Sequence, residues 1–104
     1  MQIVPLTAVA SQTENVLLGN QICQINVYQK TYGMYLDLYV NNALIIGGVV
    51  CENRNRIVRY KYLGFIGDLA FNDLQGDENP YYTGLGSRWI LLYLTEADLV
   101  TYGA

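Results

Sequence analysis

The sequence predicts a single all-β domain over residues 1–104, a small antiparallel β-barrel or sandwich of about six to eight strands with a long polar loop before the last strand. Three observations support this prediction. Apolar and polar residues alternate along residues 22–29 and 34–40, which is the period of a half-buried strand. Short turn signals separate such stretches. Helix signals are confined to the C-terminus.

The N-terminal part of the chain predicts short strands. Residues 3–6 are expected to form an edge strand, because Pro5 cannot donate a backbone hydrogen bond to a ladder. A polar segment follows, and residues 16–18 form the next short strand. Gly19 and Asn20 both tolerate a positive φ, so they predict a two-residue hairpin turn.

The middle of the chain predicts a β-meander. The strand at residues 22–29 has one buried face, which consists of Cys23, Ile25 and Val27. A turn that ends at Gly33, expected in the left-handed α conformation, leads to the strand at residues 34–40. A second two-residue turn, at Asn41 and Asn42, leads to the strand after it.

Residues 43–51 are apolar on both faces, so this strand is expected to lie in the middle of a sheet or to be covered by a partner. Gly47 and Gly48 inside it predict a β-bulge or a close approach of another backbone. Residues 52–62 are read either as an irregular basic crossover or, over residues 58–62, as a strand.

The C-terminal part predicts two strands around a long loop. Residues 65–73 form a strand, residues 74–87 a polar loop, and residues 88–95 a strand buried on both faces. Thr95 begins a helix-cap pattern, and about one helical turn is expected after it. Ordered loops of this length are more often functional than decorative, so the loop is a candidate binding element.

Composition and charge exclude several classes of function. Charged residues make up 14% of the chain and the formal net charge is −3, which argues against a general nucleic-acid binder. No apolar stretch approaches the ~18 residues of a membrane-spanning helix, and the N-terminus lacks a signal-peptide pattern. Without an export signal, Cys23 and Cys51 are expected to be free buried thiols, although one disulfide is possible.

The residue types predict neither an enzyme nor a cofactor. The chain has no histidine, so the usual general base near neutral pH is missing, and two cysteines alone cannot form a zinc site. Asp77 and Glu78 are neighbours in a loop, which does not set two carboxylates across a glycosidic bond. Together with Asp73 they are a candidate calcium site, but their spacing is not that of a calcium loop.

Candidate partner-binding residues lie in two places, and they are Arg54, Arg56, Arg59, Tyr81, Tyr82 and Leu85. Arginine pairs bidentately with carboxylates, so the three arginines predict docking on an acidic partner surface; the alternative is a solvated surface. The chain has ten tyrosines, a residue type favoured at interfaces. The loop at residues 74–86 is expected either to be ordered by a partner or to fold back on the domain as a lid.

A family resemblance spans nearly the whole chain. It rests on the order and spacing of residues 1–6 (MQIVPL), 23–30 (CQINVYQK), 36–41 (LDLYVN), 62–71 (YLGFIGDLAF) and 83–88 (TGLGSR). These segments resemble the phage baseplate plug family, small proteins of contractile-tailed phages. The resemblance implies a non-enzymatic structural protein of the virion, at the centre of the tail baseplate and assembled in the host cytoplasm. It also implies several copies per tail, in contact with hub, spike or tail-tube subunits, with no cofactor, no membrane and no need to contact nucleic acid.

The residues alone leave a second interpretation open, a stand-alone β binding module for carbohydrate or single-stranded nucleic acid. Such a module would stack exposed aromatic rings on sugars or bases. The low basic charge disfavours nucleic acid, and the carbohydrate interpretation rests on Tyr81, Tyr82 and Trp89. Apolar residues on both faces of residues 43–51 and 89–94 favour a chain covered by neighbouring subunits.

Overall fold

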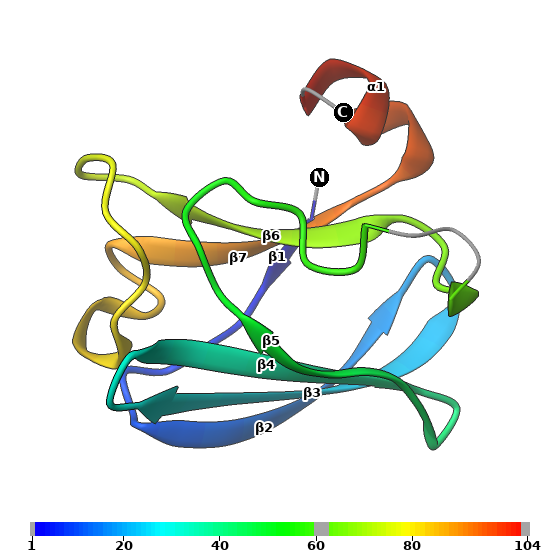
Figure 1. Cartoon of the computed structure of the whole chain (residues 1–104). Helices are drawn as coiled ribbons and strands as arrows, with labels where there is room; N and C mark the ends of the chain where they lie inside the picture. The colour runs from blue at the N-terminus through cyan, green and yellow to red at the C-terminus, as the bar shows by residue number, and fades with distance from the viewer. Residues whose placement is uncertain (1, 60–62, 103–104) are drawn as a thin grey trace.

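A computed structural model describes residues 2–59 and 63–102 and shows two antiparallel β-sheets packed face to face (Figure 1). One sheet has three strands in the order β1-β7-β6, and the other has four in the order β2-β3-β4-β5. The prediction of a small antiparallel all-β domain is confirmed. Of the two architectures left open, the structure has the sandwich, and the described strands do not close into a barrel.

The four-stranded sheet is the predicted meander, made of β2 (Ser11–Leu18), β3 (Gln21–Lys30), β4 (Gly33–Val40) and β5 (Ala43–Val50). Both predicted two-residue turns are present. Gly19 and Asn20 have φ angles of 55° and 61°, and Asn41 and Asn42 have φ angles of 50° and 67°. Such a pair of left-handed residues matches the right-handed twist of the strands on either side.

Two local predictions in this sheet are wrong. β2 begins at Ser11 rather than at Val16, so the polar segment before Val16 is part of the strand. Polar residues fit there because β2 is an edge strand and every second residue faces solvent. Gly33 has a φ of 148°, which favours glycine but is not the left-handed α conformation.

β5 lies at the other edge of this sheet, because among the described strands it pairs only with β4. The predicted position in the middle of a sheet is therefore wrong, and cover by a partner stays a prediction. The predicted bulge is confirmed, since the register between β4 and β5 shifts between Leu36 and Leu38. At this bulge Gly48 has a φ of 64°, and its N–H donates to Asp37 Oδ1 at 2.7 Å.

The three-stranded sheet consists of β1 (Gln2–Val4), β6 (Asp68–Asp73) and β7 (Trp89–Leu94). β1 is an edge strand, as Pro5 predicts, but it ends at Val4, so the predicted extension to Leu6 is wrong. β7 is the central strand, with neighbours on both sides and nearly all of its residues buried. Its predicted burial on both faces is confirmed.

A short helix, α1 (Glu96–Tyr102), follows β7 and lies above the three-stranded sheet (Figure 1). Thr95 and Asp98 form the predicted cap, since each side chain accepts a hydrogen bond from the other residue's backbone N–H. Leu99 packs against Leu92 and Leu94 on the outer face of β7. None of the helices in the described ranges has the length and hydropathy of a membrane span.

The core lies between the two sheets. The four-stranded sheet contributes Ile25, Val27, Met34, Leu36 and Leu38, and the three-stranded sheet contributes Leu69, Phe71 and Leu91. Residues 52–59 cross from one sheet to the other and run beside β6, through single bridges at Asn53 and Arg56. As far as Arg59, the segment is therefore the irregular crossover and not a strand. Residues 60–62 lie outside the described part of the chain.

Cys23 and Cys51 are free thiols, and both are buried. Burial raises the pKa of Cys51 to about 12 and also raises that of Cys23. We expect both thiols to stay reduced and to react very slowly with a thiol reagent at mildly alkaline pH, because the reactive thiolate is scarce and shielded. The measurement is the rate of alkylation in native and denaturing buffer, followed by mass spectrometry. Fast native labelling, or a peptide pair linked through both residues, would contradict it.

Candidate partner-binding surfaces

The three arginines predicted to bind a partner do not form one surface group. They lie on the irregular crossover, where Arg54 and Arg59 have positive φ angles of 64° and 71°. The side chains of these two residues are exposed, whereas Arg56 is half-buried. Arg59 Nε donates to the backbone carbonyl of Arg56 at 2.8 Å, which turns its side chain back along the crossover.

Arg56 is bound to Asp68, the first residue of β6. Its Nε lies 3.1 Å from Asp68 Oδ2, and the Asp68 side chain is only 1% exposed. The same carboxylate accepts the backbone N–H groups of Val58 and Arg59, at 2.8 and 2.9 Å. A buried carboxylate is stable only when it is paired and hydrogen-bonded in this way. Arg56 therefore holds the crossover against β6, and only Arg54 and Arg59 are presented to solvent.

We expect Arg56→Ala to destabilise the protein by about 1–3 kcal/mol, because the buried Asp68 loses its charged partner. Arg54→Ala is the matched control, and it should change the free energy of unfolding by less than about 0.5 kcal/mol. Both are measured by urea denaturation at neutral pH. Equal stability of the two variants would mean that the Arg56–Asp68 pair contributes nothing measurable.

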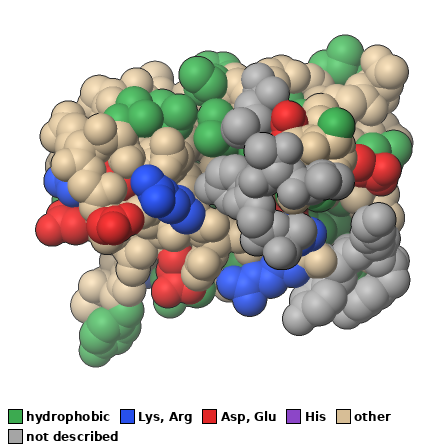
Figure 2. All heavy atoms as spheres, turned by 90° about the horizontal axis from the view of Figure 1, so that it is seen from above, with side chains coloured by type: hydrophobic (Ala, Val, Ile, Leu, Met, Phe, Trp, Pro, Cys, Tyr) green, Lys and Arg blue, Asp and Glu red, His purple; other side chains and the backbone are tan. Residues whose placement is uncertain are grey.

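Charges of both signs occur together on the face of the molecule above the three-stranded sheet. Figure 2 shows this face, with basic and acidic side chains close to one another and no large area of a single sign among the coloured atoms. This distribution fits docking through a few specific contacts better than attraction of a highly charged polymer.

The loop at residues 74–87 is attached to the end of the sandwich by Asp73, the last residue of β6. Arg88 donates to the two oxygens of this buried carboxylate, from Nε at 2.9 Å and from Nη2 at 2.8 Å. The backbone N–H groups of Gln75 and Glu78 donate to it as well, both at 2.9 Å. These hydrogen bonds, with that of Arg88 the strongest influence, hold the pKa of Asp73 well below its usual range. The carboxylate therefore serves the loop's own structure.

Trp89 and Leu85 close the loop onto the core. The Trp89 side chain is buried, and its Nε1 donates to the carbonyl of Glu78 at 3.1 Å, while the Arg88 guanidinium lies 4.5 Å from the indole ring centre. Leu85 is buried in the same core cluster. Neither residue is offered to a ligand or a partner in this conformation. The carbohydrate interpretation therefore cannot use Trp89 as a stacking residue. The loop at residues 74–87 has the contacts of a lid on the domain, and we call it the lid.

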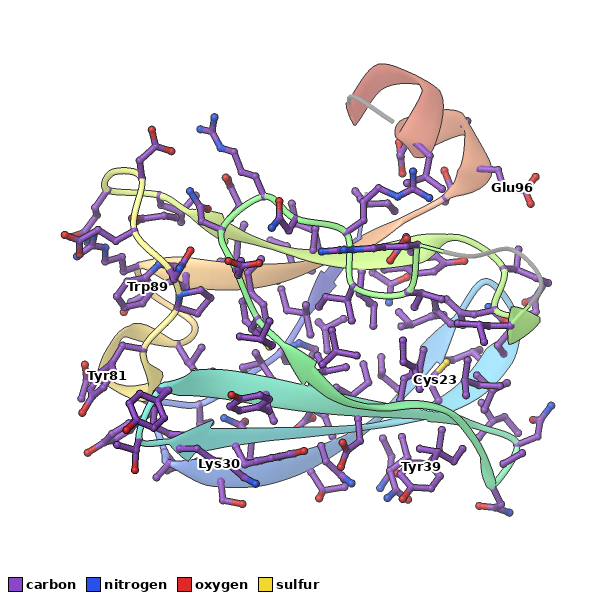
Figure 3. All side chains as sticks on the ribbon, in the orientation of Figure 1. Cys23, Lys30, Tyr39, Tyr81, Trp89 and Glu96 are labelled. Carbon is purple, nitrogen blue, oxygen red and sulfur yellow. The ribbon has the colours of Figure 1, made fainter. Side chains whose placement is uncertain are left out.

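Tyr81 and Tyr82 are the aromatic residues at the tip of this lid. Their ring centres lie 5.0 Å apart, and Tyr82 is joined to β3 because its N–H donates to Gln29 Oε1 at 3.2 Å. Tyr82 packs against the core, whereas Tyr81 is 48% exposed and points away from the body of the protein (Figure 3). Of the predicted loop residues, Tyr81 is thus the one presented for contact.

The outer face of the four-stranded sheet is a further surface that the site prediction did not include. Tyr28 and Tyr35 stack there with ring centres 6.1 Å apart, and Lys30 Nζ lies 5.5 and 5.7 Å from the two rings. Lys30 and Tyr39 both lie on this face in Figure 3. In the sequence, the alternation along β3 and β4 places these tyrosines on the polar side of their strands, and this pattern could have identified the surface. Within the described residues, no group of three acidic or cysteine side chains is arranged to hold a metal ion.

A comparison with models of protein families gives a match. The model of the family described as Cyanophage baseplate Pam3 plug gp18 matches residues 1–96 of the 104-residue chain. The matched part includes all seven described strands and the lid. No curated protein matches the sequence.

Proposed function

The chain belongs to the family of the cyanophage baseplate Pam3 plug gp18, and from this premise we propose that it lies at the centre of a contractile-tail baseplate, near the hub and the tail tube. A structural role in the phage baseplate follows from the family itself. The place within the baseplate and the contractile type of tail are our proposal. The family match over residues 1–96 is the observation that carries it.

The proposed partners are other baseplate proteins, namely hub, spike or tail-tube subunits, with several copies of this chain in each tail. Assembly in the host cytoplasm is part of the same proposal. The contacts are proposed to include Tyr81 at the tip of the lid and Arg54 and Arg59 on the crossover. Support comes from their exposure and chemistry, since aromatic and arginine side chains are enriched where protein surfaces meet.

We further propose that the protein acts by contact alone, without catalysis. The most buried carboxylates support this, because Asp68 and Asp73 each accept several hydrogen bonds that hold a segment of the chain in place. Such groups are used for structure and are not left facing a substrate. The family is one of baseplate plugs, which is consistent with a structural role.

The test is genetic. A phage that encodes this protein receives a stop codon early in the gene, and a plasmid supplies a tagged copy of the protein in trans. Without the plasmid we expect no infectious particles and tails that lack a complete baseplate in electron micrographs; with it, the tagged protein should be found in purified tails. Normal tails in the absence of the protein would refute the proposal.

The contact residues are tested in the same complementation assay. Tyr81→Ser and the double variant of Arg54→Ala with Arg59→Ala should fold normally but enter tails less efficiently. Lys30→Ala removes an exposed cation from the outer face of the four-stranded sheet, which is itself a candidate contact surface, so the comparison shows whether a loss of incorporation is specific to the crossover. Unchanged incorporation of the double arginine variant would show that the crossover is a solvated surface.

A further inference from the structure

Both edges of the four-stranded sheet are open in the described part of the chain. β2 pairs only with β3, and β5 pairs only with β4, so no strand covers the backbone N–H and C=O groups along either edge. Side chains reach two of these groups: Gln2 Nε2 donates to the Leu17 carbonyl at 3.4 Å, and the Gly48 N–H donates to Asp37. Proteins usually protect such edges with lysine, proline or a covering segment. β5 has no charged residue and no proline, and β2 has a single charge, Glu14. These two edges are therefore fitted to pair with another strand.

The two edges also fit each other. The sheet has an even number of strands and each is antiparallel to its neighbour, so β2 and β5 run in opposite directions. When two copies lie side by side in the same orientation, β5 of one meets β2 of the next as an antiparallel pair. Both strands have eight residues. The neighbour that matches each edge in length and direction is thus a second copy of this chain.

Exposed aliphatic side chains mark the end of the sheet where the two copies would meet. Leu17 of β2 is 58% exposed, and its cross-strand partner Ile22 is 69% exposed. At the opposite edge Leu44 of β5 is 57% exposed. All three side chains lie on the outer face, near the hairpin turns at Gly19–Asn20 and Asn41–Asn42. Leu44 pairs with Tyr39, and Tyr39 pairs with Gln24 of β3, which is two residues from Ile22. Side-by-side addition would bring Leu44 of one copy against Leu17 and Ile22 of the next.

We propose that copies of this protein associate laterally, with β5 of one copy beside β2 of the next, so that the four-stranded sheets continue from subunit to subunit. The register between β4 and β5 shifts on both sides of Leu38, so the β5 ladder is regular only over Ala43–Leu44 and Val49–Val50. The contact uses two different patches, and repeated addition gives a closed ring or an open filament. The inference does not depend on the place proposed for the protein in the baseplate.

Two charge substitutions test the pairing on the purified full-length protein. The unmodified protein should form species larger than a monomer in sedimentation velocity as its concentration rises. Leu17→Lys and Leu44→Lys should each abolish this association. Leu74→Lys, a substitution at an equally exposed leucine in the loop, is the control and should leave it intact. An unmodified protein that stays monomeric at all concentrations overturns the proposal.

Mixing the two variants distinguishes this contact from others. Leu17→Lys keeps an intact β5 edge and Leu44→Lys keeps an intact β2 edge, so an equimolar mixture should form one contact and stop at a heterodimer. A symmetric β5–β5 dimer would instead leave Leu17→Lys unaffected and would give no heterodimer on mixing; either result overturns the proposal. As a check of geometry, a mixture of Leu17→Cys and Leu44→Cys should form the mixed disulfide on mild oxidation, and formation of only the two homodimers would also overturn it.

Discussion

Replacing Gly67 with alanine is expected to lower the melting temperature by more than roughly 10 °C. Gly67 has a φ of 93°, and a side chain in such a conformation costs about 1–3 kcal/mol. A methyl group here would also overlap the backbone carbonyl oxygen of Leu94 and come within 2.9 Å of the Tyr93 ring. Neither can move freely, since Tyr93 OH donates to the carbonyl of Ile66 at 2.6 Å and Leu94 pairs with Asp68 in the sheet. The overlap adds a further penalty of about 1–3 kcal/mol, which is a large share of the roughly 5–15 kcal/mol that stabilises a domain.

Gly64→Ala separates the two contributions. Gly64 has a φ of 88°, close to that of Gly67, but a methyl group there would meet no atom within 4 Å. It should therefore show only the backbone penalty. The measurement is thermal unfolding of both variants by circular dichroism. If Gly64→Ala and Gly67→Ala unfold at the same temperature, the contact with Leu94 and Tyr93 is not what makes Gly67 necessary.

Replacing Asp73 with alanine is expected to release the lid over residues 74–87. The substitution removes the acceptor for Arg88 and for the backbone N–H groups of Gln75 and Glu78. Hydrogen exchange should become much faster across the lid while the amides of β3 and β4 stay protected. Asp77→Ala is the control, since the exposed Asp77 accepts one side-chain hydrogen bond, from Asn53. A lid that exchanges as slowly in Asp73→Ala as in the unmodified protein would show that Trp89 and Leu85 hold it without the carboxylate.

The same carboxylate predicts a pH dependence. Because the pKa of Asp73 is lowered in the folded state, its contribution to stability is fully present above the ordinary carboxyl pKa of 3.8 and is lost as the pH falls through the folded-state value. The lid should thus stay protected from neutral pH down to about pH 4 and open in stronger acid. In Asp73→Ala the acid step in lid exchange should be missing. An unchanged step would assign it to another acidic group.

The meander could be predicted from the sequence because its signals are local. Alternation set the faces of β3 and β4, and the turns at Gly19–Asn20 and Asn41–Asn42 need only the residues that form them. The position of β5 could not be predicted in this way. An apolar strand has the same pattern whether it lies inside its own sheet or is covered by another subunit. The sequence therefore left both positions open, and the structure excludes the central one.

The candidate site was harder to predict, because the function of a charged side chain depends on a partner far away in the sequence. Arg54, Arg56 and Arg59 look equivalent along the chain, yet only Arg56 lies next to the buried Asp68. Likewise Leu85 and Tyr81 belong to the same loop, and one is buried while the other is exposed. The sequence predicted the segments that we propose for contact, and the fold shows which residues within them are exposed.

The pairing of the first strand with the last has a consequence for how the chain folds as it is made. β1 lies beside β7, with Gln2 opposite Tyr93, so the three-stranded sheet cannot be completed until residue 93 has left the ribosome. The meander of β2 to β5 forms from neighbouring segments and can fold much earlier. Until β6 and β7 arrive, its apolar inner face has no cover, and this exposed apolar surface makes the nascent chain prone to aggregation.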